Sequence, residues 1–226
     1  MKHTEDNIVN KMIEEARHDF RDHIVTIKTE GDVTVIDWKK SNASIEYAVR
    51  YLLHDHHVYI SGDLGYAVFN LTWDATIKSF KDINIDYMLE KLETVSDPGK
   101  YVFDNNLACQ FLIDYLAIKA ALPSNLSIKE MKDYINDHEF DDNYYEEPSF
   151  ELFKKLYKKA LKADSISEWE AFIDQIDWQD YMDEDFSDWY DDSLYNSGTR
   201  YSYRVIAYVV GLWMINEQIN EEKKEK

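Results

Sequence analysis

The sequence predicts an α+β fold, in which an N-terminal helix and a small antiparallel β-meander pack against a larger helical C-terminal part. Between residues 23 and 71, apolar and polar side chains alternate, which is typical of strands with one buried face. After Leu71 the apolar spacing changes to three and four, which is typical of amphipathic helices. With 45% apolar and 15% aromatic residues, the chain can bury one sizeable core or two small ones. We expect one continuous domain over residues 1–226.

The β-rich front covers residues 1–71. Its first apolar residues recur at spacings of three and four, which predicts a helix over residues 6–22 with Thr4 or Asp6 near its cap. The connection at residues 29–32 contains Gly31, which suits a hairpin turn. The extended runs after the helix predict an antiparallel meander of four or five strands, at residues 23–28, 33–38, 44–53, 57–61 and 66–71.

The helical part covers residues 72–220, and residues 221–226 form a charged tail. Two short helices are expected first, with bounds from Thr72 or Asp74 to Phe80 and from Asn84 or Asp86 to Thr94. Longer helices are predicted at residues 105–121, 127–137, 149–162, 165–176 and 200–219. The last helix is apolar over most of its girth, so we expect it at the centre of the fold.

Two of these helices carry a start signal. In a capping box, a Ser oxygen and a Glu carboxylate satisfy each other's exposed backbone amides at a spacing of three residues. Ser127 with Glu130 and Ser167 with Glu170 have this spacing. We therefore expect both serines at helix N-termini.

The chain is strongly acidic, with 45 Asp and Glu against 25 Lys and Arg and a formal charge of −20. Nucleic acid and anionic membrane are poor direct partners for such a chain. The single cysteine, Cys109, lies in an apolar run and is expected to be a small buried hydrophobe. No apolar signal region or membrane-spanning stretch occurs, so the cytoplasm is the expected location.

The acidity is concentrated between residues 163 and 199, where 37 residues include twelve carboxylates and no Lys, Arg or His. Aromatic residues are interleaved with the acids, whereas purely solvating acidic tails lack them. These aromatic residues can supply a core that holds the carboxylates on a folded surface, where their fields add. Such a surface prefers cations, or proteins built to bind a polyanion. The alternative interpretation is solubility alone.

The densest basic patch contains Lys154, Lys155, Lys158 and Lys159 at helical spacing. The pattern favours a solvated helix face opposite a buried one, and the lysines can also pair with the acidic run that follows. No basic groove accompanies the tyrosines, which argues against stacking on nucleic acid. No nucleophile elbow or zinc-protease helix is present, so an enzyme is not the expected function.

The most ligand-like cluster is His54-Asp55-His56-His57. Alternate residues of a strand share a face, so His54 and His56 can point together, and imidazoles with a carboxylate can hold a first-row metal. The cluster also lies where a hairpin must turn, and a polar turn is the favoured interpretation. We therefore expect no cofactor, and the alternative is a metal site built from His54, His56 and Asp63.

The segment Gly62-Asp63-Leu64-Gly65 follows an extended run. Its amides can form a nest for an anion, with Asp63 as a metal ligand or base. It lacks the third glycine of the dinucleotide fingerprint and the Gly-Lys-Ser/Thr of a P-loop. A tight turn between strands needs the same glycines for positive φ, and this interpretation is favoured.

Two segments carry a resemblance. The run Val58-Tyr59-Ile60-Ser61-Gly62-Asp63-Leu64-Gly65-Tyr66-Ala67-Val68-Phe69 resembles a pattern in uncharacterised proteins of phages and prophages of Gram-positive bacteria. The later run Tyr203-Arg204-Val205-Ile206-Ala207-Tyr208-Val209-Val210-Gly211-Leu212-Trp213-Met214 does so too. The resemblance implies a mobile-element accessory protein, a class that includes acidic inhibitors of host defence such as DNA mimics and anti-CRISPR proteins.

The leading hypothesis is a non-catalytic, phage-encoded anti-CRISPR protein whose carboxylates occupy the basic groove of a host nucleic-acid-binding protein, such as an RNA-guided nuclease. Trp178, Trp189 and Tyr190 are expected to anchor the contact. The carboxylates expected to make it are Asp177, Asp180, Asp183, Glu184, Asp185, Asp188, Asp191 and Asp192. The rivals are a metal-dependent protein centred on His54–His57 and Asp63, and a structural or regulatory phage protein whose acidity is only solubility.

Overall fold

The computed structural model describes residues 2–42, 44–81, 83–119, 122–123, 125–137, 148–178 and 192–222. It confirms the α+β class, with a six-stranded antiparallel sheet and several helices. The sequence predicted one continuous domain, and the chain groups into two compact units. Residues 1–101 and 201–226 form the sheet unit, and residues 102–200 form the helical unit. Each unit has a hydrophobic core of its own, which is the physical basis of the division.

The sheet unit begins with helix α1 (Lys2–Asp19) and continues into an antiparallel meander in which neighbours in sequence pair in space. Its strands are β1 (His23–Glu30), β2 (Val33–Lys40), β3 (Val49–His54), β4 (His57–Gly62), β5 (Ala67–Asn70) and β6 (Leu92–Val95). The strand β6 corrects the sequence prediction, which extended a helix to Thr94. Helix α2 (Ile85–Glu90) ends earlier, with Lys91 as its C-cap, and the chain then pairs with β5.

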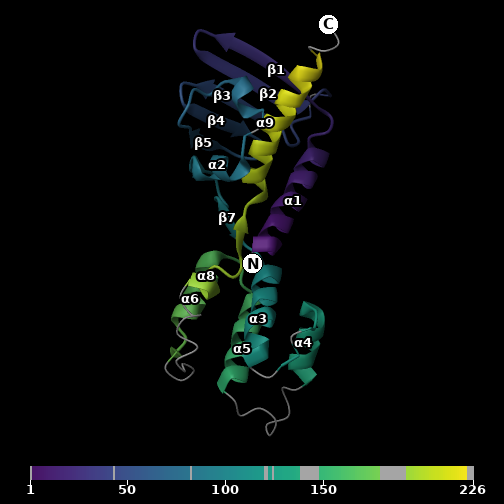
Figure 1. Ribbon diagram of the computed structural model, residues 1–226, viewed down its shortest axis with the longest axis vertical. Helices are drawn as coiled ribbons and strands as arrows, with labels where there is room; N and C mark the ends of the chain where they lie inside the picture. The colour runs from purple at the N-terminus through teal and green to yellow at the C-terminus, as the bar shows by residue number, and fades with distance from the viewer. Residues whose placement is uncertain are drawn as a thin grey trace. The chain divides into compact units, whose positions relative to one another are not determined.

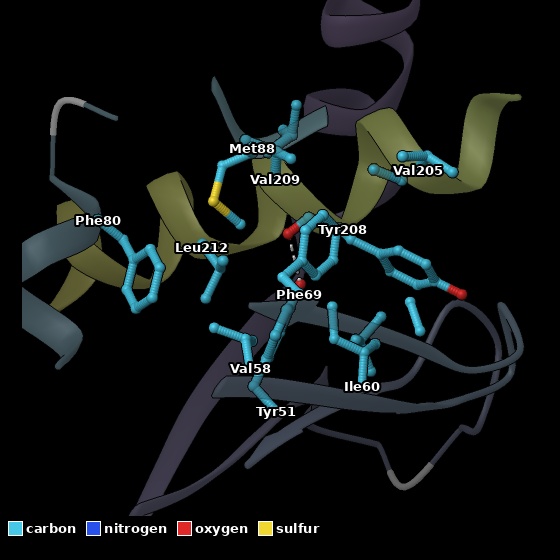
Figure 2. Packing of buried hydrophobic residues seen from close by; sticks show 14 of the residues in the cluster. Tyr51, Val58, Ile60, Phe69, Phe80, Met88, Val205, Tyr208, Val209 and Leu212 are labelled. Carbon is cyan, nitrogen blue, oxygen red and sulfur yellow. Dashed lines mark hydrogen bonds between the residues drawn. The ribbon is translucent and has the colours of Figure 1, made fainter. Parts of the chain in front are cut away.

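The inner face of the sheet is covered by helix α9 (Tyr203–Glu222), with α1 packed beside it (Figure 1). Alternate residues of the central strands, among them Tyr51, Val58 and Phe69, point at this helix (Figure 2). The buried hydroxyl of Tyr51 donates to the carbonyl oxygen of Tyr208 at 3.0 Å. The prediction that the last helix is central is confirmed for the sheet unit, although the predicted 72–220 boundary placed this helix with the others.

A close approach at Gly211 allows this packing. A Cβ built there would lie 2.2 Å from the hydroxyl oxygen of Tyr51, so the absence of a side chain lets the helix reach the sheet. The loop after β5 carries the short 3₁₀ helix η1 (Ile77–Phe80), where the sequence predicted a longer helix from Thr72 or Asp74. The buried ring of Phe80 fixes η1 to the core.

The helical unit contains α3 (Asn105–Lys119), α4 (Ile128–Asp137), α5 (Pro148–Ala160), α6 (Ile166–Asp174) and α8 (Asp192–Tyr195). Helices α3 and α5 lie side by side (Figure 1). The chain crosses the two unit boundaries in two short paired strands, β7 (Tyr101–Phe103) and β8 (Thr199–Tyr201). The sequence did not predict these strands. In the part of the chain that the structure describes, no helix is both long and apolar enough to cross a membrane.

The capping box at Ser127 is confirmed, because Ser127 N donates to the Glu130 carboxylate at 2.9 Å and Glu130 N donates to Ser127 Oγ at 3.3 Å. The predicted cap at Ser167 is wrong by two residues. Ser165 Oγ accepts from Glu168 N at 3.1 Å, and Asp164 N donates to the Glu168 carboxylate at 3.0 Å. The same physical device therefore starts α6 one half-turn earlier.

Candidate functional site

The first third of the acidic run is built on α6. Trp169 and Ile173 lie on its buried face, and Trp169 Nε1 donates to the carbonyl oxygen of Leu194 at 3.0 Å. The carboxylates of Asp164 and Asp174 are exposed on the other side. Trp169 therefore fixes the backbone that displays the acids, as the sequence predicted for the aromatic residues of this run.

The basic patch on α5 partly neutralises this acidic surface. Lys159 forms an ion pair with Glu168, and Lys154 pairs with Glu151 at 2.5 Å on its own helix. A backbone hydrogen bond from Asp164, followed by the Lys159 interaction, lowers the pKa of Glu168 below its ordinary value. The prediction that these lysines can pair with the acidic run is confirmed at Lys159.

The next two residues of the predicted contact surface behave differently from each other. Asp177 is exposed, as a contact residue must be. Trp178 is only 8% exposed, and its Nε1 donates to the carbonyl oxygen of Ile173 at 3.2 Å. The prediction that Trp178 anchors a partner is therefore corrected, because its ring is packed in the core of the helical unit.

Most of the remaining contact residues lie outside the described part of the chain. These are Asp180, Asp183, Glu184, Asp185, Asp188, Trp189, Tyr190 and Asp191. Asp192 is the first residue of α8. The role of this segment in binding a partner remains a prediction from the sequence.

The alternative metal set of His54, His56 and Asp63 is not brought together. Strand β4 separates His56 from Asp63, and Tyr47 N donates to Asp63 Oδ2 at 2.9 Å at the far end of that strand. His56 turns toward the loop after β5, where its Nδ1 lies 3.4 Å from Asp74 Oδ1. His54 and His56 face different neighbours because residues around a tight hairpin turn do not keep the alternating directions of a regular strand.

A different group meets at this end of the sheet. The β1–β2 and β3–β4 turns lie at the same end of an antiparallel meander, and His54 Nε2 lies 3.2 Å from Asp32 Oδ2. Asp32, His54 and Asp55 each offer one ligand atom within 4.8 Å of the others. Sequence reasoning missed Asp32, although the expected strand order places its turn beside that of Asp55.

The glycine segment after β4 is a tight turn, as the favoured interpretation predicted. Gly62 and Gly65 have φ of 144° and 97°, and Gly65 N donates to Gly62 O at 3.1 Å. Asp63 N donates to Ala48 O at 2.9 Å, while its carboxylate holds the backbone of Tyr47. Asp63 thus joins the β2–β3 and β4–β5 connections, which is a structural task.

Cys109 is fully buried in the core of the helical unit, as expected. Burial, with a smaller contribution from Asp104, raises the pKa of its thiol to about 12. Because the thiolate is the reactive form, this sulfur is not an activated nucleophile at neutral pH.

Comparisons with protein-family models, with curated proteins and with solved structures found no match. The resemblance to phage and prophage proteins, and the inhibitor class that it implies, therefore stay predictions from the sequence.

Proposed function

We propose that the protein is a non-catalytic, phage-encoded inhibitor of a host nucleic-acid-targeting defence system, of anti-CRISPR type. Its acidic run occupies the basic nucleic-acid-binding groove of the target, which is an RNA-guided nuclease acting in the host cytoplasm. Such a groove presents Lys and Arg side chains spaced for phosphates, and an array of carboxylates can take the place of those phosphates.

The observation that carries the proposal is the burial of aromatic residues inside the acidic run. Trp169 and Trp178 are 0% and 8% exposed, whereas the intervening Asp174 and the adjoining Asp177 are exposed. A run selected only for solubility gains nothing from tryptophans locked in a core. Fixed carboxylates, by contrast, lose little conformational freedom on binding and add their fields at defined positions.

The overall charge supports the same target class. At −20, the chain is attracted over long range to a basic protein and repelled by nucleic acid. Attraction of this kind acts mainly on the rate of association, so the inhibitor competes for the groove before nucleic acid is bound.

The first prediction tests location against bulk charge. The test variant replaces six acids by Lys, namely Asp183, Glu184, Asp185, Asp188, Asp191 and Asp192. The control variant replaces six exposed acids of the sheet unit, namely Glu14, Glu15, Glu30, Glu90, Asp97 and Glu221. Asp19 is left out of the control because it accepts a hydrogen bond from Tyr203 Oη at 2.5 Å. Both variants change the net charge equally.

The measurement is inhibition of DNA cleavage by purified RNA-guided nucleases of Gram-positive bacteria, with the inhibitor added before or after target DNA. We expect the test variant to lose inhibition and the control to keep it. Wild-type inhibition should weaken as salt rises, because exposed charges are screened over about 8 Å at physiological ionic strength. Equal losses in both variants would leave bulk charge as the only cause, and wild-type protein that inhibits no nuclease would refute the proposal.

A further inference from the structure

The end of the sheet that carries the β1–β2 and β3–β4 turns gathers three side chains with metal-binding chemistry. His54 Nε2 lies 3.2 Å from Asp32 Oδ2, and His54 Nδ1 lies 3.8 Å from Asp55 Oδ2. One ligand atom from each of the three residues lies within 4.8 Å of the other two. Ligand atoms bound to one metal at about 2.0–2.2 Å lie about 3.4 Å from one another. Binding therefore requires side-chain rotations that bring the Asp32 and Asp55 oxygens to the same nitrogen of His54.

From this juxtaposition we infer that Asp32, His54 and Asp55 form a binding site for a divalent first-row transition metal. One imidazole nitrogen and two carboxylate oxygens suit Zn²⁺, Co²⁺ or Mn²⁺, whereas Mg²⁺ prefers an all-oxygen shell. The three side chains keep exposed surface, which leaves the remaining coordination positions to water. The inference is independent of the proposed inhibitor function.

The turn that supplies two of the ligands is held by backbone hydrogen bonds. The carbonyl oxygen of Asp55 accepts from Ala75 N at 2.6 Å, and that of His56 accepts from Leu71 N at 2.8 Å. Asp55 itself adopts a positive φ of 49°, which Asp tolerates better than most residues. The site therefore rests on a fixed scaffold, and a metal bound there joins two turns that no covalent bond connects.

Electrostatics favours a cation at this position. Two carboxylates lie close together in a chain of formal charge −20, and their fields add to attract a cation to this end of the sheet. His56 does not complete the set, because its Nδ1 faces Asp74 at 3.4 Å. His57 stacks on Tyr59 with ring centroids 5.6 Å apart. His56 therefore supplies a matched control on the same hairpin.

The test is calorimetric titration of the purified full chain with ZnCl₂, MnCl₂ and MgCl₂, with melting temperature as a second readout. We expect one Zn²⁺ per chain, a higher melting temperature with Zn²⁺ than without it, and no Mg²⁺ binding at equal concentration. D32N, H54A and D55N should each weaken Zn²⁺ binding by about tenfold or more, since even indirect changes to a metal site commonly cost that much. Asn has nearly the same shape as Asp, and Asp32 and Asp55 are exposed, so we expect both Asn variants to fold as the wild type does.

The control variants are H56A and D63N, which belong to the alternative metal set of His54, His56 and Asp63. Both should bind Zn²⁺ as the wild type does. Absence of stoichiometric Zn²⁺ binding to the wild type would overturn the inference. So would equal weakening by H56A, because it would indicate binding to surface histidines in general. None of these measurements involves a nuclease, so their failure is distinct from failure of the proposed function.

Discussion

At the scale of single residues, His23 is a polar side chain buried in the core of the sheet unit. It is 2% exposed and packs against Phe20 and Trp38, with ring centroids 5.0 and 5.6 Å away. Its Nε2 donates to the carbonyl oxygen of Tyr47 at 3.2 Å, so the proton of the neutral ring lies on Nε2. Nδ1 then has no hydrogen-bond partner among the described residues.

This environment predicts a dependence of stability on pH. Burial lowers the pKa of His23 below its ordinary value, and this effect outweighs the hydrogen bond to the Tyr47 carbonyl, which raises the pKa. Lys40 lowers the pKa further, and Asp22 and Asp19 oppose it with smaller effects. The unfolded chain therefore binds a proton at a higher pH than the folded chain. Stability contributed by the neutral ring is present above the unfolded pKa of about 6.5 and is lost as pH falls below it.

The measurement is the melting temperature at neutral and mildly acidic pH for the wild type, H23Q and H56Q. We expect the wild type and H56Q to lose stability on acidification, and H23Q to lose less because Gln does not titrate in this range. H23Q should also be less stable at neutral pH, since its side chain fills the aromatic pocket less well. Parallel pH profiles for all three proteins would show that His23 does not control acid stability.

At the scale of secondary-structure elements, the end of β4 brings Gly62 against the chain that enters β3. A Cβ at Gly62 would lie 2.1 Å from the carbonyl oxygen of Ala48, on backbone that also needs a φ of 144°. We therefore expect G62A to lower the free energy of unfolding by about 2–5 kcal/mol, from backbone strain and overpacking together. Denaturant titration followed by circular dichroism measures this loss.

The matched control is G31A in the β1–β2 turn. Gly31 has a φ of 60°, but no atom lies within 4 Å of a Cβ built there. Only the strain of the left-handed region applies, which costs about 1–2 kcal/mol. Similar losses in G31A and G62A would mean that the close approach to Ala48 is relieved by a local shift of the chain.

The same scale shows which parts of the fold a sequence reveals. Features that depend on neighbours in sequence could be predicted. The capping box at Ser127 and the mostly apolar surface of α9 are two of them. The strand β6 was missed because four residues directly after a helical turn carry too little periodicity, and only pairing with β5 makes them a strand. The approach of Asp32 to His54 was missed for a similar reason, because it depends on two turns meeting in space.

At the scale of the whole molecule, the acidic run and the proposed metal site lie in different compact units. All residues of the first core come from residues 1–101 and 201–226, and all residues of the second come from within residues 102–200. The sequence could not show this division, because the chain leaves the sheet unit and returns to it without a proline-rich or glycine-rich linker. Both crossings instead fall within the paired strands β7 and β8.

This organisation predicts that the sheet unit folds without the helical unit. Ser202 N donates to Lys100 O at 2.9 Å, and the rings of Tyr101 and Tyr201 stack with centroids 5.1 Å apart. A Gly/Ser linker of about four residues, a usual hairpin length, can therefore join residue 101 to residue 201. The shortened chain keeps the six strands, α1 and α9, so we expect a single cooperative unfolding transition in calorimetry.

The shortened chain also separates the two functional proposals. It should bind Zn²⁺ as the full chain does, because Asp32, His54 and Asp55 all lie in the sheet unit. It should not inhibit an RNA-guided nuclease, because the acidic run is gone, whereas residues 102–200 expressed alone should inhibit if they fold. A shortened chain that unfolds without cooperativity would show that the sheet unit depends on the segment it lost. Inhibition retained by a folded shortened chain would move the partner-binding surface to the sheet unit.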